Sequence, residues 1–326
     1  MTKRMSKMSP NLPVIDITPF STNAPAGQDS SAKRDVGAQL AEACSQHGVF
    51  YLKSGDIGRL TNEKRLRTFE AAKQFFALPE EVKKAVPISP GGFTRGYIGI
   101  GGESGSSALE VKEAFSYGYR WPDDKPPGNS LQGPNKWPDL SHLPPDWETT
   151  LHDFYAGMVE IATAVTRALS VSLGFPEDHF PSFCTQGDTI SLMRFFHYFP
   201  YRAAGSVAGG EVERIGSSPH TDWGFLTLIL QQDGVIGLQV ADGEGGWKDV
   251  PPIPGTLIVN AGDYLALLTR GRVKSPLHRV ITSEEERLSM VFFYYPVSVL
   301  PYRLMLQAPS TQQVESCRPT THEFPL

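Results

Sequence analysis

The amino-acid sequence predicts a mainly β protein with flanking helices. Segments that read as strands dominate the chain after Pro181, whereas apolar residues at helical spacing occur before it. The 326 residues include 31 glycines and 27 prolines, more than a helical bundle needs, and both residue types favour turns. Helices followed by six or more strands indicate a β-sandwich or barrel that helices buttress.

The first elements alternate between strand and helix. Residues 12–17 are apolar and β-branched, which predicts a strand with Pro13 at its start or edge. Apolar residues then recur at helical spacing up to Cys44, and Gly48 follows as a stop signal. Residues 49–52 read as a short buried strand.

Two further helices are expected before the strands. Residues 62–78 form the first, which Pro79 ends, and its apolar face contains Leu66, Phe69, Ala72 and Phe76. Asp146 is placed to cap the second, and Gly174 is placed to end it. The apolar stripe of this long helix comprises Leu151, Tyr155, Met158, Ile161, Val165, Leu169 and Leu173.

Two long loops and a series of strands complete the expected elements. Residues 91–107 form a loop rich in glycine and serine, and residues 121–145 form an ordered surface excursion, either a covering loop or a plain connector. The expected strands, which glycine-rich turns separate, are residues 190–198, 225–231, 237–240, 255–260, 278–281 and 288–295.

Composition excludes several classes of partner. The net charge of −5 and the pI of about 5.9 argue against a general nucleic-acid binder. No apolar run reaches the roughly 18 residues that cross a bilayer, and no secretory signal is recognisable. Three cysteines cannot form a disulfide framework and suit a reducing compartment. We therefore expect a soluble, cytoplasmic protein that binds neither membrane nor nucleic acid.

The pattern His220-Thr221-Asp222 is the strongest local sign of chemistry. In extended chain, residues two apart point to the same face, so this imidazole and carboxylate converge. His278 begins a later strand-like segment. Two histidines and one carboxylate that leave three positions open are the ligand set of non-haem Fe(II) oxygen chemistry. A chance His-x-Asp pair, or histidines held by ordinary hydrogen bonds, stays open as the alternative.

Arg287 and Ser289 add a second candidate site. They follow His278 on the next strand-like run and share one face, where a guanidinium and a hydroxyl would bind a carboxylate. A structural ion pair with one of the acidic residues 284–286 is the alternative. An arginine that enters so apolar a strand needs a buried anionic partner, and a bound small acid supplies one.

In order and spacing, five blocks of this sequence resemble the isopenicillin N synthase-like family, whose members are mostly Fe(II)- and 2-oxoglutarate-dependent dioxygenases. The resemblance covers about residues 11–300. The blocks are His220-Thr221-Asp222-Trp223-Gly224, Gly237-Leu238-Gln239-Val240, Asn260-Ala261-Gly262-Asp263, the segment 271–280 and Arg287-Leu288-Ser289.

The resemblance implies a double-stranded β-helix, or jelly-roll, core at residues 186–300. A helical and β N-terminal region at 11–185 would buttress it, and residues 301–326 would form a C-terminal tail. It also implies that His220, Asp222 and His278 ligate Fe(II), and that Arg287 and Ser289 bind the distal carboxylate of 2-oxoglutarate.

The family often adds a tyrosine from the strand that precedes the His-x-Asp motif. Counting from Arg194 makes this residue Tyr198, whereas counting back from Pro200 makes it Phe199, which has no hydroxyl. A core aromatic is the alternative reading of Tyr198. The chain therefore departs from the family pattern by one residue at this position.

The expected reaction uses O₂ and converts 2-oxoglutarate to succinate and CO₂ while a small organic substrate is hydroxylated, desaturated or oxidatively rearranged. By strand parity Phe293 faces inward, so it either lines the substrate pocket or packs in the barrel core. Trp223, Arg95 and Tyr97 are further candidates for substrate contact, with scaffold packing or a solvated surface position as the alternatives. The aromatic wall favours a largely hydrophobic substrate, and family membership suggests specialised-metabolite biosynthesis.

Two other functions stay open from the sequence. An oxidase of the isopenicillin N synthase type would keep Fe(II) but not 2-oxoglutarate, and isopenicillin N synthase itself carries an Arg-x-Ser pair. A non-catalytic jelly-roll binding protein with a degenerate site is the other possibility. The substrate and the oligomeric state are not encoded in any pattern found here.

Overall fold

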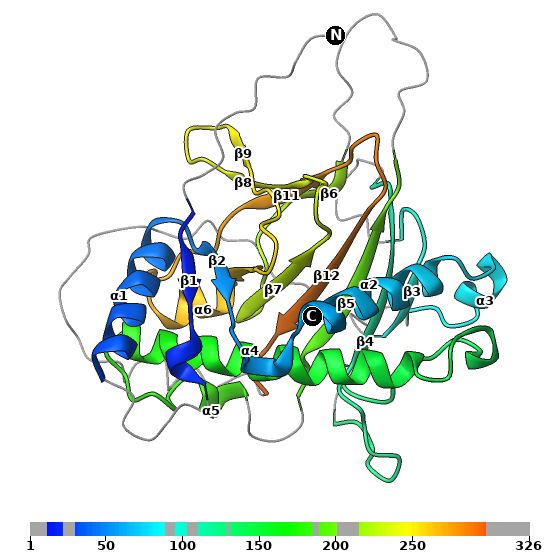
Figure 1. The fold of residues 1–326 in the computed structure, drawn as a ribbon, viewed down its shortest axis with the longest axis horizontal. Coiled ribbons are helices and arrows are strands. Elements are labelled where there is room, and N and C mark those ends of the chain that lie inside the picture. The colour runs from blue at the N-terminus through cyan, green and yellow to red at the C-terminus, as the bar shows by residue number, and fades with distance from the viewer. Residues whose placement is uncertain are drawn as a thin grey trace, which may run out of the picture.

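The computed structural model describes residues 12–21, 30–88, 95–102, 110–128, 131–184, 189–200 and 215–297 (Figure 1). Within these residues the larger sheet has eight strands. Its spatial order is β1 (Val14–Asp16), β2 (Val49–Lys53), β10 (Leu257–Ala261), β7 (Leu226–Gln231), β12 (Arg287–Tyr294), β5 (Leu192–Tyr198), β4 (Lys112–Gly118) and β3 (Gly96–Ile98). The β1–β2 pair is parallel, and the other described pairs of this sheet are antiparallel.

A smaller sheet packs against one face of the larger one. In the described part of the chain it has four strands, in the order β6 (Ile215–His220), β11 (His278–Ile281), β8 (Leu238–Ala241) and β9 (Trp247–Asp249). One apolar cluster joins the two sheets, since it combines Leu238 and Val280 of the smaller sheet with Phe196, Ile229 and Val291 of the larger. Two sheets that enclose a common core confirm the predicted jelly roll.

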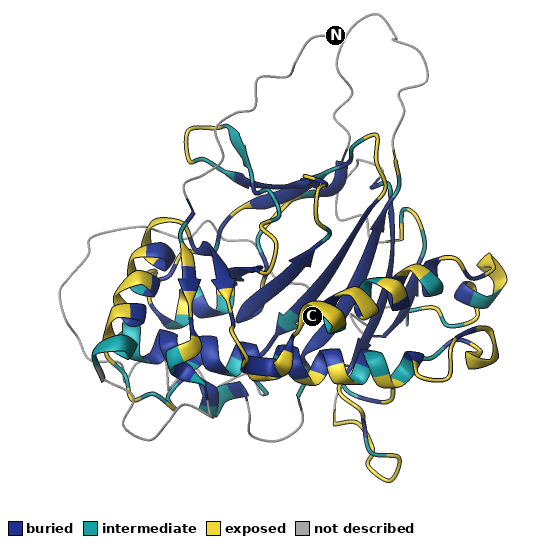
Figure 2. Cartoon of the chain, in the orientation of Figure 1, coloured by how far each residue is buried: buried dark blue, intermediate teal, exposed yellow. Residues whose placement is uncertain are grey.

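Helices cover the opposite face of the larger sheet (Figure 1). The α-helices are α1 (Ser30–Gln46), α2 (Asn62–Phe76), α3 (Glu80–Lys84), α4 (Trp147–Ser172), α5 (Pro181–Cys184) and α6 (Asp263–Leu268). Short 3-10 turns are η1 (Thr18–Phe20), η2 (Ile57–Arg59) and η3 (Leu140–His142). Figure 2 shows the strands of the larger sheet almost wholly buried, while α1 and α2 carry exposed residues on their outer sides.

Strand parity separates the two faces of the larger sheet. On β12, Leu288 and Phe292 belong to the core beneath the helices, whereas Val291 and Phe293 pack in the cluster between the sheets. This alternation follows from the two-residue period of a strand. It places Arg287 and Ser289 on the face toward the smaller sheet, which we call the inner face.

The long helix α4 agrees closely with the expected apolar stripe. Leu151, Met158 and Leu169 are fully buried, and Gly174 follows the helix with φ of 80°, a conformation that glycine adopts without strain. Asp146 stands at the N-cap but makes no capping hydrogen bond. Its carboxylate instead accepts a hydrogen bond from Arg67.

Four strands were not predicted, and one predicted core residue is wrong. Strands β3, β4, β6 and β9 are short, polar or interrupted by Gly and Pro, so their periodicity is weak. Strand β3 lies inside the segment expected to be a loop. Leu66 is 69% exposed, because the buried face of α2 is instead formed by Arg65, Thr68, Ala71, Ala72, Phe75 and Phe76.

The two predicted regions share one sheet. Strand β2, from the expected N-terminal region, pairs with β10 of the expected core along Val49–Leu52. The boundary near residue 186 stays a prediction, and the proposed tail 301–326 lies outside the described residues. None of the described helices is long and apolar enough to span a bilayer.

Candidate active site

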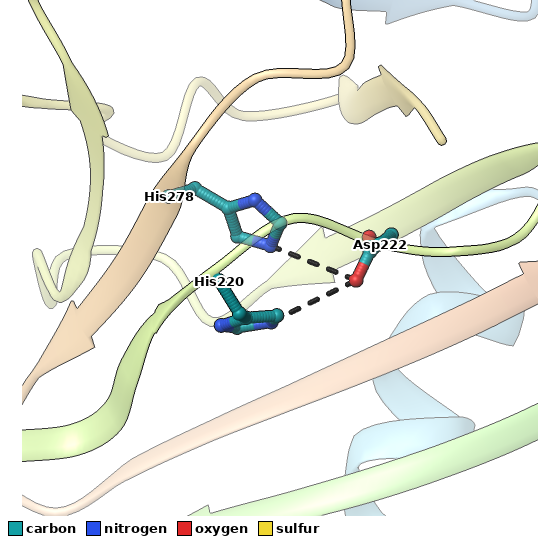
Figure 3. Close-up of side chains that lie close together, drawn as sticks. All are labelled: His220, Asp222 and His278. Carbon is teal, nitrogen blue, oxygen red and sulfur yellow. Dashed lines mark ion pairs between the residues drawn. The ribbon is translucent and has the colours of Figure 1, made fainter. Parts of the chain in front are cut away.

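His220, Asp222 and His278 converge on one point, as Figure 3 shows. His220 ends β6, His278 begins β11, and these two residues are direct partners in the smaller sheet. The Nε2 atoms of His220 and His278 lie 3.7 and 3.8 Å from Oδ1 of Asp222. One ligand atom from each residue lies within 4.8 Å of the others, which is the spacing that a single bound metal ion requires.

Hydrogen bonds orient both imidazoles toward this point. Nδ1 of His220 lies 2.7 Å from the carbonyl oxygen of Ser218, and Nδ1 of His278 lies 3.0 Å from that of Pro276. A carbonyl only accepts, so each Nδ1 carries a proton, and it is Nε2 that is left to bind a metal when the imidazole is neutral. Such outer partners fix the tautomer of metal-binding histidines.

The carboxylate of Asp222 is held in the same way. Its Oδ2 accepts hydrogen bonds from the Thr227 hydroxyl at 2.5 Å and from Nδ2 of Asn260 at 2.9 Å. These two donors leave Oδ1 directed at the histidines. Thr227 and Asn260 occupy adjacent strands in register, so the sheet itself sets their spacing. Asn260 stood in a recognised block, but neither residue was predicted for the site.

The protonation states suit a divalent cation. Burial alone would raise the pKa of Asp222, but His278 and the hydrogen bonds from Asn260 and Thr227 outweigh it and hold the pKa below its usual value. Burial lowers the pKa of His220, and the nearby His278 adds to that shift. An ionised carboxylate and a neutral imidazole are the forms that bind metal.

A tight turn presents Asp222, and the start of α6 holds that turn. The backbone N–H of Asp263 donates to the carbonyl of Asp222 at 2.7 Å, and the N–H of Tyr264 donates to that of Gly224 at 3.2 Å. A Cβ on Gly262 would lie 2.1 Å from the carbonyl oxygen of Gly224, so only glycine fits. The block at 260–263 therefore holds the backbone on either side of Trp223, next to Asp222.

Arg287 is a buried cation on the inner face. It is 3% exposed, and its Nη2 donates to Oε1 of Gln231 at 3.0 Å. Its Nε and Nη1 are buried and have no hydrogen-bond partner among the described residues. No ion pair with the acidic residues 284–286 is found in the described chain. A buried guanidinium in this state calls for an anion.

Ser289, Gln231 and Tyr198 surround that arginine. Ser289 is 2% exposed, pairs with Gln231 across β7 and shares the face of Arg287. The guanidinium carbon lies 5.1 Å from the centre of the Tyr198 ring, and the two residues are register partners. Phe199 packs instead on His197. This placement favours Tyr198 over Phe199, and it adds Gln231, which sequence reasoning missed.

The candidate substrate residues divide by position. Phe293 lies on the inner face, and Trp223, beside Asp222, is 49% exposed and packs on Tyr295 with ring centres 4.8 Å apart. The prediction that Tyr97 contacts the substrate is wrong. Its ring lies in the core beneath the helices, on the far side of the sheet from Ser289.

Arg95 is buried, so the alternative expected for it, a solvated surface position, is wrong. Its side chain is 3% exposed and donates to Oδ1 of Asn135 and to the carbonyl of Leu131. It lies against Gly118, whose strand partner Leu192 is in turn paired with Phe293. A role for Arg95 in substrate contact stays a prediction.

The chain resembles known proteins over most of its length. Residues 12–140 match the profile of the non-haem dioxygenase in morphine synthesis N-terminal family, and residues 190–296 match that of the 2OG-Fe(II) oxygenase superfamily. A 2-oxoglutarate-Fe(II) type oxidoreductase of Aspergillus fumigatus is 34% identical over 89% of this chain and 83% of its own length. Clavatol oxidase of Penicillium crustosum is 35% identical, over 89% of this chain and 87% of its own length.

A solved structure gives the same result. A full-length Neurospora crassa protein in complex with α-ketoglutarate (2-oxoglutarate) superposes with a TM-score of 0.74 and 27% identity, covering 91% of this chain and 90% of its own. The same protein has also been solved with α-ketoglutarate and thymine together.

Proposed function

This chain belongs to the 2OG-Fe(II) oxygenase superfamily, and we propose that His220, Asp222 and His278 hold its Fe(II) while Arg287 and Ser289 bind its 2-oxoglutarate. The protein is an Fe(II)- and 2-oxoglutarate-dependent dioxygenase that acts on a small organic molecule. When bound, the iron supplies the redox chemistry that couples O₂ and decarboxylation of 2-oxoglutarate to oxidation of a C–H bond.

The single observation that supports the cosubstrate site is the hydrogen bonding of the buried Arg287 side chain. Two of its buried donor atoms have no acceptor among the described residues, while Gln231 holds a third. A planar guanidinium binds a carboxylate through two parallel hydrogen bonds, and Ser289 can donate one more. Tyr198 supports the guanidinium from the neighbouring strand.

The residues of the chain bind, orient and exclude water. The two imidazoles and Oδ1 of Asp222 would hold the metal, a ligand set that would leave positions open for the cosubstrate and O₂. Apolar inner-face residues such as Val291 and Ile229 surround the site and would exclude water from it. No protein group within the site is needed as a general base, since the reaction is oxidative.

We further propose that the substrate belongs to specialised metabolism and is oxidised in the cytoplasm. Relatives such as clavatol oxidase support the metabolic role, and the unpaired cysteines Cys44 and Cys184 suit a reducing compartment. The acidic net charge of −5 supports a protein that works without nucleic acid. Binding to membranes is not expected either, and the oligomeric state is left open.

Succinate release tests the function. The apoprotein is reconstituted anaerobically with Fe(II) and 2-oxoglutarate, O₂ is admitted, and succinate is measured with and without candidate substrates. We expect succinate from the wild type and none from His278→Ala, which loses a metal ligand. His142→Ala, an exposed histidine of η3, is the matched control.

The outcome also separates the alternatives. Substrate turnover without any succinate would identify an oxidase of the isopenicillin N synthase type. Fe(II) binding that survives in an Asp222→Ala/His278→Ala double variant would show that the metal is bound elsewhere, as in a non-catalytic binding protein.

A further inference from the structure

Strand β6 carries His220 at the edge of the smaller sheet. In the described part of the chain this strand pairs only with β11. The ladder shifts register between His278 and Val280 and again between Val280 and Ile281, and Pro219, just before His220, has no backbone N–H to donate. The ladder by itself therefore restrains the backbone beside this metal ligand only weakly.

A buried ion pair from the N-terminal region lies against β6. Glu110 and Lys112 are 5% and 7% exposed, and Nζ of Lys112 lies 3.0 Å from Oε2 of Glu110. Between them, the backbone N–H of Val111 donates to the carbonyl of Ile215, the first residue of β6, at 3.3 Å. All three residues of this segment belong to the part of the chain that matches the N-terminal family.

Both charged side chains of the pair bind β6. Oε1 of Glu110 accepts a hydrogen bond from the backbone N–H of Ser218 at 2.7 Å. Nζ of Lys112 donates to the hydroxyl of Ser217 at 2.7 Å. Hydrogen bonds to charged groups are stronger than those between neutral groups, so these two contacts supply the restraint that the ladder lacks.

Ser218 connects this ion pair to the metal ligand. Its carbonyl oxygen lies 2.7 Å from Nδ1 of His220, in the hydrogen bond that directs Nε2 of this imidazole toward the metal position. The N–H of the same residue is the group that Glu110 holds. A shift of Ser218 would therefore turn Nε2 of His220 away from Oδ1 of Asp222, which lies 3.7 Å from it.

The same part of β6 packs on the proposed cosubstrate site. A Cβ on Gly216 would lie 2.7 Å from Cδ1 of Tyr198, whose ring centre is 5.1 Å from the guanidinium carbon of Arg287. Lys112 is the register partner of Tyr198, and its Nζ lies 5.0 Å from the centre of the Phe196 ring. Close packing and the hydrogen bonds of the ion pair together leave residues 216–218 little freedom to move.

We propose that Glu110, held by Lys112, is a positioning residue of the metal site: it fixes Ser218 so that the imidazole of His220 stays directed at Asp222. This inference rests on the proposed function, because it assumes that His220 binds Fe(II). It goes further by giving the N-terminal region a part in metal binding, whereas the sequence indicates only that this region buttresses the core.

Two double variants that differ only at residue 110 test the proposal. Glu110→Gln/Lys112→Met keeps an amide oxygen that can accept from Ser218, whereas Glu110→Leu/Lys112→Met has no acceptor, and both replace the ion pair by neutral side chains. Redox-inert Mn(II) is titrated calorimetrically into each folded apoprotein. We expect the Gln variant to bind Mn(II) within about threefold of the wild type and the Leu variant to bind it about tenfold or more weakly.

A matched control separates positioning from stability. Glu113→Ala removes the partner of the buried Lys83 on the opposite face of β4, so it should lower the Tm of the apoprotein but leave the Mn(II) affinity of the folded protein within about twofold of the wild type. The visible absorption spectrum of the Co(II)-saturated protein reports the arrangement of the ligands. It should change in the Leu variant and stay the same in Glu113→Ala.

His278→Ala separates this inference from the proposed function. Mn(II) binding that survives in His278→Ala would overturn the proposed function. If His278→Ala loses Mn(II) while the Gln and Leu variants bind it equally well, the inference alone is overturned. An equal loss of Mn(II) affinity in Glu113→Ala, or an unchanged Co(II) spectrum in the Leu variant, would also overturn it, because Glu110 would then act only on general stability.

Discussion

Asp222 illustrates how single side chains prepare the metal site. Thr227 and Asn260 both donate to its Oδ2, so Oδ1 alone faces the two histidines. The same hydrogen bonds help to keep the carboxyl ionised although it is 6% exposed. Residues that never touch the metal therefore control how strongly it binds.

Thr227→Val tests whether these hydrogen bonds affect metal affinity. The substitution preserves shape but removes one of the two donors to Oδ2, so only Asn260 still holds the carboxylate, and we expect the Mn(II) or Fe(II) affinity to fall about 10–100-fold. Equilibrium dialysis measures the change. Thr68→Val, which removes a buried hydroxyl bonded within α2, should leave metal affinity unchanged. Equal losses in both variants would mean that the effect is one of general stability.

Arg287→Ala tests the cosubstrate site at the same scale. Removal of the guanidinium leaves the distal carboxylate of 2-oxoglutarate unpaired in a buried site, a loss of about 2–5 kcal/mol by analogy with interface charge pairs. The concentration of 2-oxoglutarate needed for half-maximal succinate release should rise accordingly, and Arg65→Ala should not change it. Unchanged 2-oxoglutarate affinity in Arg287→Ala would refute the assignment.

At the scale of elements, the start of α6 and the turn before β7 form one unit. Backbone N–H groups of Asp263 and Tyr264 hold the carbonyls of that turn, and Gly262 allows the close approach. The two sequence blocks, at residues 220–224 and 260–263, are thus in direct contact. A ligand residue in an isolated turn would have no such restraint.

Gly262→Ala should displace the turn. The new Cβ would lie 2.1 Å from the Gly224 carbonyl oxygen and 2.8 Å from that of Asp222, so the backbone must move and metal affinity should be lost along with stability. Gly37→Ala in α1 is the control, because its Cβ would meet ordinary contacts of 3.5 Å with Val171 and Ser172 of α4. Retained metal affinity in a folded Gly262→Ala protein would show that the turn is more compliant than its contacts indicate.

A buried polar cluster links β4, β5 and α3 beneath the helices. Glu113 accepts hydrogen bonds from Lys83 at 2.8 Å and Tyr97 at 2.7 Å, and its Oε1 lies 2.8 Å from Nδ1 of His197. Burial alone would raise the pKa of Glu113, but these hydrogen bonds and the Lys83 charge hold it below the usual value. This explains the position of Tyr97 without any role in the reaction.

Glu113→Gln should destabilise the fold by about 3–5 kcal/mol, since it leaves the buried Lys83 without its counter-charge. Because the folded-state pKa is lowered, the stabilisation is present above the unfolded-state pKa and is lost as pH falls through the folded-state value. Urea unfolding at several pH values should thus show that the difference in free energy of unfolding between the wild type and Glu113→Gln becomes smaller at acidic pH. Glu80→Gln, in an exposed pair with Lys84, should have no measurable effect; a similar loss there would contradict the role of burial.

At the scale of the molecule, the proposed metal ligands come from both sheets. His220 and His278 belong to the smaller sheet, whereas Asp222 is held by Thr227 and Asn260 of the larger sheet. A ligand that binds all three ties the sheets together only in the folded state. Binding must therefore raise the free energy of unfolding.

Thermal unfolding measures this coupling. A metal concentration about 100 times its Kd should add about 2.7 kcal/mol, so Mn(II) should raise Tm, 2-oxoglutarate should raise it further, and a chelator should reverse the shift. The Asp222→Ala/His278→Ala variant should show no metal-dependent change. A shift of equal size in that variant would place the stabilising metal outside the predicted site.

The convergence of His220, Asp222 and His278 and the shared face of Arg287 and Ser289 could be predicted because their signals are local. Short patterns such as His220-x-Asp222 and Arg287-x-Ser289 encode a shared face through the two-residue period of strands, and their order along the chain resembles one family. The long helix α4 was equally visible, since its apolar stripe repeats over 26 residues. The prediction that Leu66 lies on the buried face of α2 was wrong, because a single apolar residue does not define a buried face.

Contacts between distant segments were decided only by the tertiary structure. The sequence by itself determined the elements with regular periodicity, the residue types of the metal and carboxylate sites, and their faces. It did not determine that Thr227 and Asn260 would meet Asp222, that Gln231 would hold Arg287, or that Arg194 would lie over the ring of Phe293. These contacts depend on which strands become neighbours, and strand order arises from the packing of both sheets around one core rather than from any local pattern.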